Sequence, residues 1–366
     1  MQKLSIFSVA AVLLGACAGS SDVPDAPPLP QISSASERAE VVPRDGSLTG
    51  YLEAALSSRP ELAATLERWR AQKRRIHSID QMPSPTVSYM VALNTVGHRA
   101  GIQQPIPWPG KASSRTDVER ARELVEATRY DAQALDIAWQ VADAYWQLWG
   151  VEREHRWHEE HVAILEALAR SARSRLETGQ GLVADVGQME LERSRASDLV
   201  SRSHQAHRRA RLQLAWAAGL DVDRDDLVVT TSPPPARVAA EDAEALVASA
   251  QENPRVLALL RMQEVRTQEA QAARTAVYPD FGVGLEYEME PAAGPAMDDA
   301  AMHMLMAGVS VRLPLWIGES RAMARAAEAE RAALEADAEA ARREASRAVR
   351  QSLASLDEMV RRIELH

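Results

Sequence analysis

Two stretches of the chain alternate between apolar and polar side chains with a period of two residues. One covers residues 281–290, the other covers residues 304–313, and a shorter stretch of the same kind starts at Val87. The apolar positions of the longer stretches are Phe281, Val283, Leu285, Tyr287, Met289, Leu305, Ala307, Val309, Val311 and Leu313. This alternation predicts β-strands with one apolar and one polar face. It fits a strand that crosses a bilayer, and it equally fits the half-buried sheet of a soluble domain.

Long helices are predicted after the strands. From Gly110 to Thr178 the chain contains no proline, so a helix on the order of 100 Å long is expected. Coiled-coil spacing predicts that its packed seam consists of Leu135, Ala138, Ala142, Tyr145 and Trp149. Thr178-Gly179-Gln180-Gly181 predicts a turn, and a second helix returns from about Leu182 to Ala218. Because a soluble domain rarely needs so long a helical hairpin, this pattern favours strands that cross a membrane.

The same order of elements is predicted twice along the chain. Matched spacings relate Pro60, Pro85, Gly101 and Pro107 to Pro254, Pro279, Gly308 and Pro314. The repetition predicts repeat one at residues 46–222, a proline-containing linker at 223–239 and repeat two at 240–366. Each repeat opens with a helix, expected at about residues 47–79 and 241–276, and continues with a β-hairpin and a long helix.

Two β-hairpins supply four strands, which are too few to close a barrel. An open sheet edge is not tolerated in lipid, so the chain is expected to oligomerise. Two copies would give eight strands around a filled lumen, whereas three copies give twelve strands and an open pore. We therefore predict a mainly α fold with β-hairpins, in which long coiled-coil helical hairpins carry four membrane strands per protomer and a trimer forms a 12-stranded barrel.

The matched spacings also make a prediction about the last helix, which is expected to start at about Glu319. A second hairpin turn would fall near position 386, beyond His366, so repeat two is expected to lack its return helix. The last helix should therefore continue to the chain end, with an apolar stripe left without a partner. That stripe consists of Leu353, Leu356, Val360 and Ile363.

The first residues predict a lipoprotein signal peptide at positions 1–17. Lys3 precedes an apolar run from Leu4 to Leu14, which is shorter than the roughly 20 residues that a membrane helix needs. Leu14-Gly15-Ala16-Cys17 resembles a lipobox, which implies cleavage before Cys17 and acylation of that residue. A plain signal peptide with an incidental cysteine is the alternative. The prolines, serines and aspartates of residues 18–45 predict a disordered tether.

Composition and charge exclude several classes of function. The formal net charge of −10 argues against a nucleic-acid partner, which would require a basic face. The sequence contains neither Gly-x-Ser-x-Gly nor His-Glu-x-x-His, and its single cysteine cannot form an intramolecular disulfide. We therefore predict that the protein is not an enzyme and needs no cofactor.

Three motifs resemble a known family. Gly101-Ile102-Gln103-Gln104-Pro105-Ile106-Pro107-Trp108-Pro109-Gly110-Lys111 resembles the segment that follows the first strands in TolC-like outer-membrane factors, particularly in the branch that serves heavy-metal efflux pumps. Glu177-Thr178-Gly179-Gln180-Gly181 with Asp185, and Gly308-Val309-Ser310-Val311 to Pro314, are similar to the same family. The resemblance covers about residues 47–366.

The resemblance implies a function and a location. It implies a homotrimer, lipid-anchored in the outer membrane and extending into the periplasm, that docks to a periplasmic adaptor protein and an inner-membrane pump of the resistance-nodulation-division type. Such a protein would be a passive exit duct for metal cations or small toxic molecules. The alternatives are a structural coiled-coil outer-membrane lipoprotein and the exit duct of a type I protein secretion system.

Candidate pore-lining residues lie on the polar side of the strands, and they are Glu286, Glu288, Glu290 and Ser310. If the apolar side meets lipid, three copies of these carboxylates would form rings that attract cations. Alternatively, the glutamates lie in a surface loop, where their charge is merely solvated. At the hairpin turn the resemblance implies that Leu182, Val183 and Asp185 contact the adaptor and narrow the pore, although Asp185 also fits a simple first-turn acid.

Two groups of residues could bind metal ions. His155 and His158 precede the hairpin turn and His204 and His207 follow it, so the two pairs should be neighbours that could hold zinc or copper. Ordinary charge pairing between nearby glutamates and arginines is the alternative. Met304 and Met306 could bind monovalent copper or silver through their thioethers, or they could simply be adaptable apolar side chains of a strand.

Overall fold

The computed structural model describes residues 26–29, 45–79, 82–91, 97–221, 227–231, 233, 239–290 and 302–365. The predicted signal peptide, with Cys17, lies outside these residues, as does most of the predicted tether. Within the described ranges, no helix combines the length and the apolar character needed to cross a membrane.

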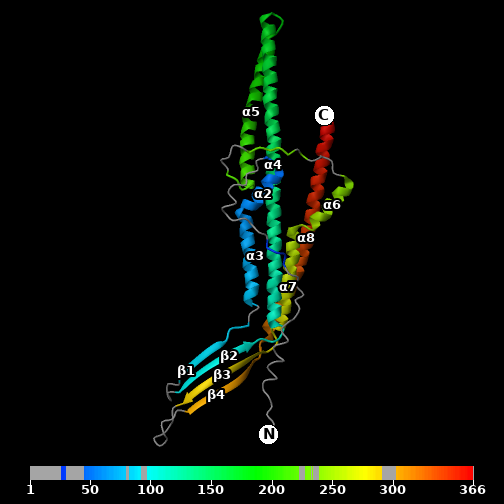
Figure 1. The fold of residues 1–366 in the computed structure, drawn as a ribbon. Helices are drawn as coiled ribbons and strands as arrows, with labels where there is room; N and C mark the ends of the chain where they lie inside the picture. Colours follow the sequence, from blue (N-terminus) through cyan, green and yellow to red (C-terminus); the bar gives the residue numbers. More distant parts are fainter. Residues whose placement is uncertain are drawn as a thin grey trace. The chain divides into compact units, whose positions relative to one another are not determined.

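Eleven elements follow one another along the described chain (Figure 1). The first half contains α2 (Leu48–Ser58), α3 (Pro60–Ile79), β1 (Thr86–Val91), β2 (His98–Ile106), α4 (Lys111–Glu177) and α5 (Val183–Ala217). The second half contains α6 (Ala240–Gln251), α7 (Pro254–Thr275), β3 (Asp280–Glu290), β4 (Met302–Arg312) and α8 (Ile317–Glu364). The predicted fold class, mainly α with antiparallel hairpins, is confirmed.

The single opening helix predicted for each half is wrong, because each is divided into two helices. Arg59 and Asn253 precede a proline at the first position of α3 and of α7, and both have extended backbone angles. A residue before proline is pushed out of the helical region by the proline ring, so the preceding helix must end there. The Asn253 side chain then caps α7, accepting from the backbone N–H groups of Arg255 and Val256 at 3.0 Å.

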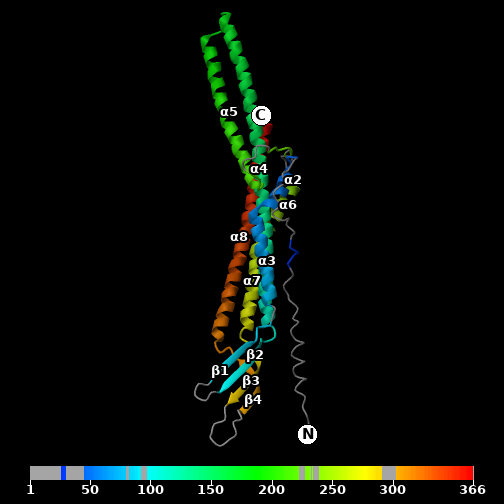
Figure 2. The ribbon, with the colours of Figure 1, turned by 60° about the vertical axis from the view of Figure 1, so that its left-hand side comes forward.

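The four strands form one antiparallel sheet in the order β1-β2-β3-β4 (Figures 1 and 2). The two hairpins are therefore joined through β2 and β3, whose register pairs Arg99 with Glu288 and Ile102 with Leu285. Directly paired residues of an antiparallel sheet project to the same face. The register thus separates an apolar face from a polar face, as the alternation predicts. Val87, Leu305 and Val309 on the apolar face are 73–76% exposed.

The described contacts divide the chain into two compact units. One unit contains residues 1–29, 66–129 and 240–355, and the other contains 30–65, 130–239 and 356–366. Each unit therefore combines segments from both halves of the chain, whereas the predicted repeats follow one another in sequence. The repeat boundaries stay a prediction.

The unit of residues 30–65, 130–239 and 356–366 contains the helical hairpin of α4 and α5. Its core includes Tyr51, Ile137, Val141, Tyr145, Leu148 and Leu214, each at most 1% exposed. The predicted seam of α4 is wrong here, because Leu135 is 50% exposed and, of the predicted residues, only Tyr145 is buried. The packed seam instead follows Ile137, Val141, Ala144 and Leu148, whose spacing of four, three and four also fits a coiled coil.

The other unit contains the sheet, most of α3, the first part of α4, and α6, α7 and most of α8. Ala121, Leu124 and Val125 of α4 pack against Val265 of α7, and Ala26 covers this cluster. Trp69 of α3 donates a hydrogen bond from Nε1 to Glu123 at 3.3 Å. The helices of this unit therefore pack through small side chains and a few buried polar contacts.

The last helix, α8, has the form predicted for it. It continues without a turn from Ile317 to Glu364. Within its predicted apolar stripe, Ile363 is 74% exposed, and Leu353, Leu356 and Val360 are half-buried.

Candidate pore-lining face

The polar face of the sheet carries a cluster of three charges near the loop ends of β2 and β3. Arg99 Nε lies 2.9 Å from Glu286 Oε1, and Arg99 Nη2 donates to Glu288 Oε1 at 2.6 Å. The pairing follows from the register, since Arg99 lies directly opposite Glu288 and next to Glu286 on the same face. One guanidinium therefore pairs with two of the three glutamates predicted to line the pore. Glu290, the third, pairs with Met302 at the end of β3.

Towards the helices the polar face consists mainly of glycine, serine and glutamine. Gly101, Gly284, Gly308, Ser88, Gln103 and Ser310 line a groove of about 390 Å³ together with neighbouring strand residues. Gln103 Nε2 donates to Ser310 Oγ at 2.6 Å. At Gly282 a Cβ atom would lie 2.6 Å from Ser310 Oγ, so a side chain at this position would require Ser310 to rotate away. The predicted Ser310 thus lies on the same face as Glu286 and Glu288.

Aromatic residues lie at both ends of the apolar face, one group at the loop ends of the strands and one group at their helical ends. At the loop ends Tyr89 OH lies 3.0 Å from His98 Nδ1, and Tyr287 OH lies 2.6 Å from His303 Nδ1. Both pairs are stacked at ring-centroid distances of 6.2 and 5.9 Å, so each hairpin carries the same pair. At the helical ends Trp108 stacks on Tyr278 and Phe281.

Met304 and Met306 lie on the polar face, opposite Glu288 and Glu286 in the register of β3 and β4. His303 projects to the opposite face, where it contacts Tyr287. The two methionines therefore share a face with carboxylates, and the histidine between them in sequence does not belong to that group.

The hairpin turn between α4 and α5 exposes two apolar residues. Leu182 is 67% exposed and Val183 is 74% exposed. Gly179 has φ +73°, a left-handed conformation that ends α4, and the backbone N–H of Gln180 donates to the Arg175 carbonyl at 2.8 Å. Asp185 Oδ2 accepts from the backbone N–H of Leu182 at 3.3 Å. Asp185 thus has the local role of a first-turn acid at the start of α5.

The predicted histidines meet across the helical hairpin. The His155 ring lies 5.9 Å from the His204 ring and 6.2 Å from the His207 ring. His158 is separate from them, with Nε2 3.5 Å from Glu154 and its ring against Trp157. The neighbouring carboxylates approach histidines, since Glu152 lies 3.6 Å from His207 and Glu159 lies 3.5 Å from His155. Among the described residues, no set of three or more His, Cys, Asp and Glu side chains has an arrangement that could hold a metal ion.

The fold resembles those of solved outer-membrane channels. A membrane protein from Pseudomonas aeruginosa matches with a TM-score of 0.68 and 18% identity, covering 94% of this chain and 86% of that one. CusC matches with a TM-score of 0.64 and 15% identity, covering 87% of this chain and 79% of that one. The outer membrane protein VceC from Vibrio cholerae matches with a TM-score of 0.62 and 16% identity, also covering 87% of this chain and 79% of that one. No curated protein sequence matches the chain.

Residues 245–366 match the family model described as outer membrane efflux protein. The match covers the last third of the chain. The predicted resemblance to TolC-like outer-membrane factors is thereby confirmed.

Arg99, the partner of Glu286 and Glu288, was not predicted from the sequence. Its strand, β2, contains His98, Arg99, Gln103 and Gln104 and does not alternate clearly between apolar and polar residues, so no pattern assigned Arg99 to a face. The signal that could have found it is the duplication. If β1–β2 and β3–β4 are equivalent hairpins, an arginine near the loop end of one can meet glutamates near the loop end of the other.

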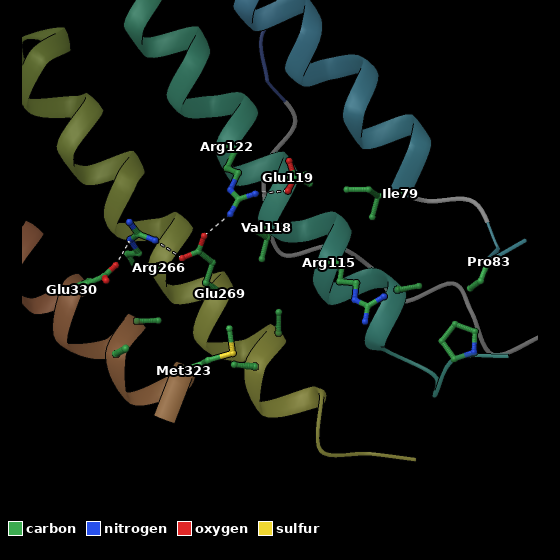
Figure 3. Close-up of a pocket in the computed structure, with 16 residues that line it drawn as sticks. Ile79, Pro83, Arg115, Val118, Glu119, Arg122, Arg266, Glu269, Met323 and Glu330 are labelled. Atoms are coloured by element: carbon green, nitrogen blue, oxygen red, sulfur yellow. Dashed lines mark hydrogen bonds and ion pairs between the residues drawn. The ribbon is translucent and has the colours of Figure 1, made fainter. Parts of the chain in front are cut away.

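A second feature that was not predicted from the sequence is an ion-pair chain across α4, α7 and α8 (Figure 3). Arg122 Nη2 lies 2.6 Å from Glu269 Oε1, and Arg266 Nη1 donates to Glu269 Oε2 at 2.6 Å. Arg266 Nε also lies 2.9 Å from Glu330. These residues border a groove of about 790 Å³ whose wall includes Val118, Ala273, Met323 and Ala327.

The charges of this chain shift the pKa of its central carboxylate. Burial alone would raise the pKa of Glu269, but hydrogen bonds and charge from Arg266 and Arg122 hold it below its ordinary value. Burial would lower the pKa of Arg122, and Glu269 and Glu119 raise it instead. Both residues therefore stay ionised, and the chain links three helices of one unit.

Proposed function

We propose that the protein is the outer-membrane exit duct of a tripartite efflux system. The observation that supports this most directly is the sheet, which has one glycine-rich polar face bearing charges and one exposed apolar face bounded by aromatic residues. β3 and β4 each contain 11 residues, within the range of about 9–11 residues that a tilted strand needs to cross a bilayer.

The proposed assembly is a homotrimer. β1 and β4 are the outer strands of the sheet, and each needs a partner if the apolar face is surrounded by lipid. Three copies joined through these strands would close a 12-stranded barrel with an open lumen. The polar face, with Glu286, Glu288, Glu290 and Ser310, would line that lumen.

The proposed partners are a periplasmic adaptor protein and an inner-membrane pump of the resistance-nodulation-division type. The exposed Leu182 and Val183 at the turn of the helical hairpin give the adaptor an apolar contact point. The duct itself would be a passive conduit with no catalytic residue and no cofactor, and the pump would supply the energy. Lipid attached to Cys17 is proposed to anchor the protein in the membrane.

The proposed cargo is metal cations or small toxic molecules. Cations are favoured by Glu286 and Glu288 on the proposed lumen face and by the net charge of −10. Met304 and Met306 beside these carboxylates add thioethers that suit soft cations.

The test uses the full chain, purified in detergent. Light scattering should give the mass of three chains, and insertion into a planar bilayer should give discrete conductance steps. A monomer without conductance would contradict the proposal and favour a structural coiled-coil lipoprotein. Efflux assays with metal salts, toxic organic compounds and a secreted polypeptide then distinguish the three kinds of cargo.

A further inference from the structure

Arg99 is the feature of the polar face with the clearest consequence for what passes along it. It is the basic residue within the charged cluster at the loop ends of β2 and β3, and it contacts both Glu286 and Glu288. One positive and two negative charges leave this cluster with a net charge of −1 per chain. The two glutamates without Arg99 would give a charge of −2 per chain.

The three side chains are accessible to solvent as well as paired. Those of Arg99 and Glu286 are 43% and 39% exposed, and that of Glu288 is 20% exposed. Their charges can therefore act on ions that pass over the polar face. The Debye length is about 10 Å at 0.1 M ionic strength, so charges farther than this from a passing ion are largely screened.

Side-chain size concentrates this effect at one level of the sheet. Towards the helices, Gly101, Gly284 and Gly308 present no side chain to the groove. At the level of the cluster the register aligns Met90, Arg99, Glu288 and Met304 across all four strands. This row contains four long side chains, whereas the row of Gly284 and Gly308 contains one, that of Gln103, so we expect the level of Arg99 to be the narrower one.

We propose that Arg99 sets the ion preference of the duct by neutralising one of the two carboxylates at its narrow outer level. This inference rests on the proposed function, since it requires the polar face to line a water-filled lumen. In a trimer the cluster would form a ring of three Arg99 and six glutamates that prefers cations only weakly. The alternative is a purely structural role, in which the ion pairs of Arg99 only hold β2 against β3.

Two variants separate these roles because both break the ion pair but change the charge in opposite directions. Arg99→Gln removes the positive charge beside the two glutamates, and the double variant Glu286→Gln, Glu288→Gln removes both negative charges and leaves the charge of Arg99. If Arg99 sets ion preference, the first variant should shift the reversal potential towards the equilibrium potential of the cation. The double variant should shift it towards that of the anion. A purely structural role predicts that both variants behave alike.

The measurement is the reversal potential of single trimers in a planar bilayer with a KCl gradient, at low salt so that screening is weak. Arg99→Lys should keep the wild-type potential because it keeps the charge. Arg70→Gln is the matched control, since Arg70 pairs with Glu67 within α3 and lies outside the sheet. Light scattering of each variant checks that the oligomer persists.

The expected result is opposite shifts for Arg99→Gln and the double glutamine variant, with no shift for the two controls. Unchanged reversal potentials in conducting Arg99→Gln trimers would overturn the inference and leave the proposed function standing. A wild-type protein that does not conduct would overturn the proposed function itself, and the inference with it.

Discussion

Arg59 joins three segments in the core of the unit that contains the α4–α5 hairpin. Its side chain is buried, with Nη1 donating to the carbonyls of Trp216 and Ala217 at 3.2 Å. These carbonyls belong to the last residues of α5, where the helix leaves them without intrahelical partners. Arg59→Ala should therefore lower the free energy of unfolding by about 2–3 kcal/mol, measured by urea unfolding monitored by far-UV circular dichroism. Arg70→Ala, which removes an exposed ion pair, should change it by about 0.5 kcal/mol or less, and an equal loss from both variants would contradict this account.

Glu269 makes stability depend on pH. Its pKa is lowered in the folded protein by Arg266 and Arg122, so its contribution is present above the ordinary pKa of a glutamate, about 4.3. That contribution is lost as the pH falls through the lowered pKa, because the folded state then has to take up a proton. As the pH falls from 6 to 3, the melting temperature of the wild type should therefore fall more than that of Glu269→Gln. Glu339→Gln, an exposed control within α8, should keep the wild-type slope, and parallel curves for all three proteins would contradict the prediction.

At this scale the sequence predicted where side chains lie better than what they touch. Alternation placed Glu286, Glu288 and Ser310 on one face because a period of two residues follows from strand geometry. Alternation could not identify Arg99 as the partner of these glutamates. That contact depends on the register between β2 and β3, and Arg99 and Glu288 are 189 positions apart in the sequence. His155 was correctly expected to meet His204 and His207 across the hairpin, because the turn position fixes which residues of α4 and α5 are neighbours. His158 does not join them and contacts Glu154 and Trp157 instead.

Among the elements, the helical hairpin depends on two glycines at its turn. A Cβ atom at Gly181 would lie 2.9 Å from the backbone nitrogen of Leu176, and this backbone atom cannot rotate away as a side chain can. Gly181→Ala should therefore destabilise the turn by about 1–3 kcal/mol through overpacking, seen as faster amide hydrogen exchange on both sides of residue 181. Gly187→Ala is the matched control, since a Cβ there meets nothing within 4 Å in α5, and it should stabilise the helix by about 0.5–1 kcal/mol. Faster exchange in both variants would show that the turn geometry is not the cause.

Element types were predictable, whereas their edges and packed faces were less so. The long helices follow from proline-free sequence, and the turn follows from its glycines. The predicted seam of α4 was displaced because a leucine was expected to be buried, whereas Leu135 is exposed in this chain. Small residues such as Ala144 and Ala210 fill the core instead, and an alanine gives a weak hydrophobic signal. β2 has no clear alternation and contains Pro105, which is tolerated because β1 ends its pairing at Gln103.

For the whole molecule, the proposed lipid anchor and the proposed assembly should be separable. Cys17 is followed by a stretch rich in proline, serine and aspartate, so the lipid would be attached through a segment outside the sheet. Cys17→Ala should therefore lose lipid labelling and reach the outer membrane in smaller amounts, while the protein purified in detergent keeps the mass of the wild-type oligomer. Labelling with a fatty-acid analogue, membrane fractionation and light scattering measure the three quantities. A Cys17→Ala protein that is monomeric would contradict the separation of anchor and assembly.

The strand order has a consequence for the time course of folding. Each hairpin pairs neighbours in sequence, but the seam between β2 and β3 joins residues 189 positions apart, and contacts between distant residues form slowly. Two finished hairpins with four open edges should therefore exist before the sheet does, at a stage when wrong edges can pair. A slip of two residues at the seam would preserve both faces, so the apolar pattern cannot correct it. Arg99 can oppose the slip, because only the native register places it opposite Glu288, the middle one of the three glutamates on this face of β3. The residue that sets the charge of the finished sheet would then also help to select its register.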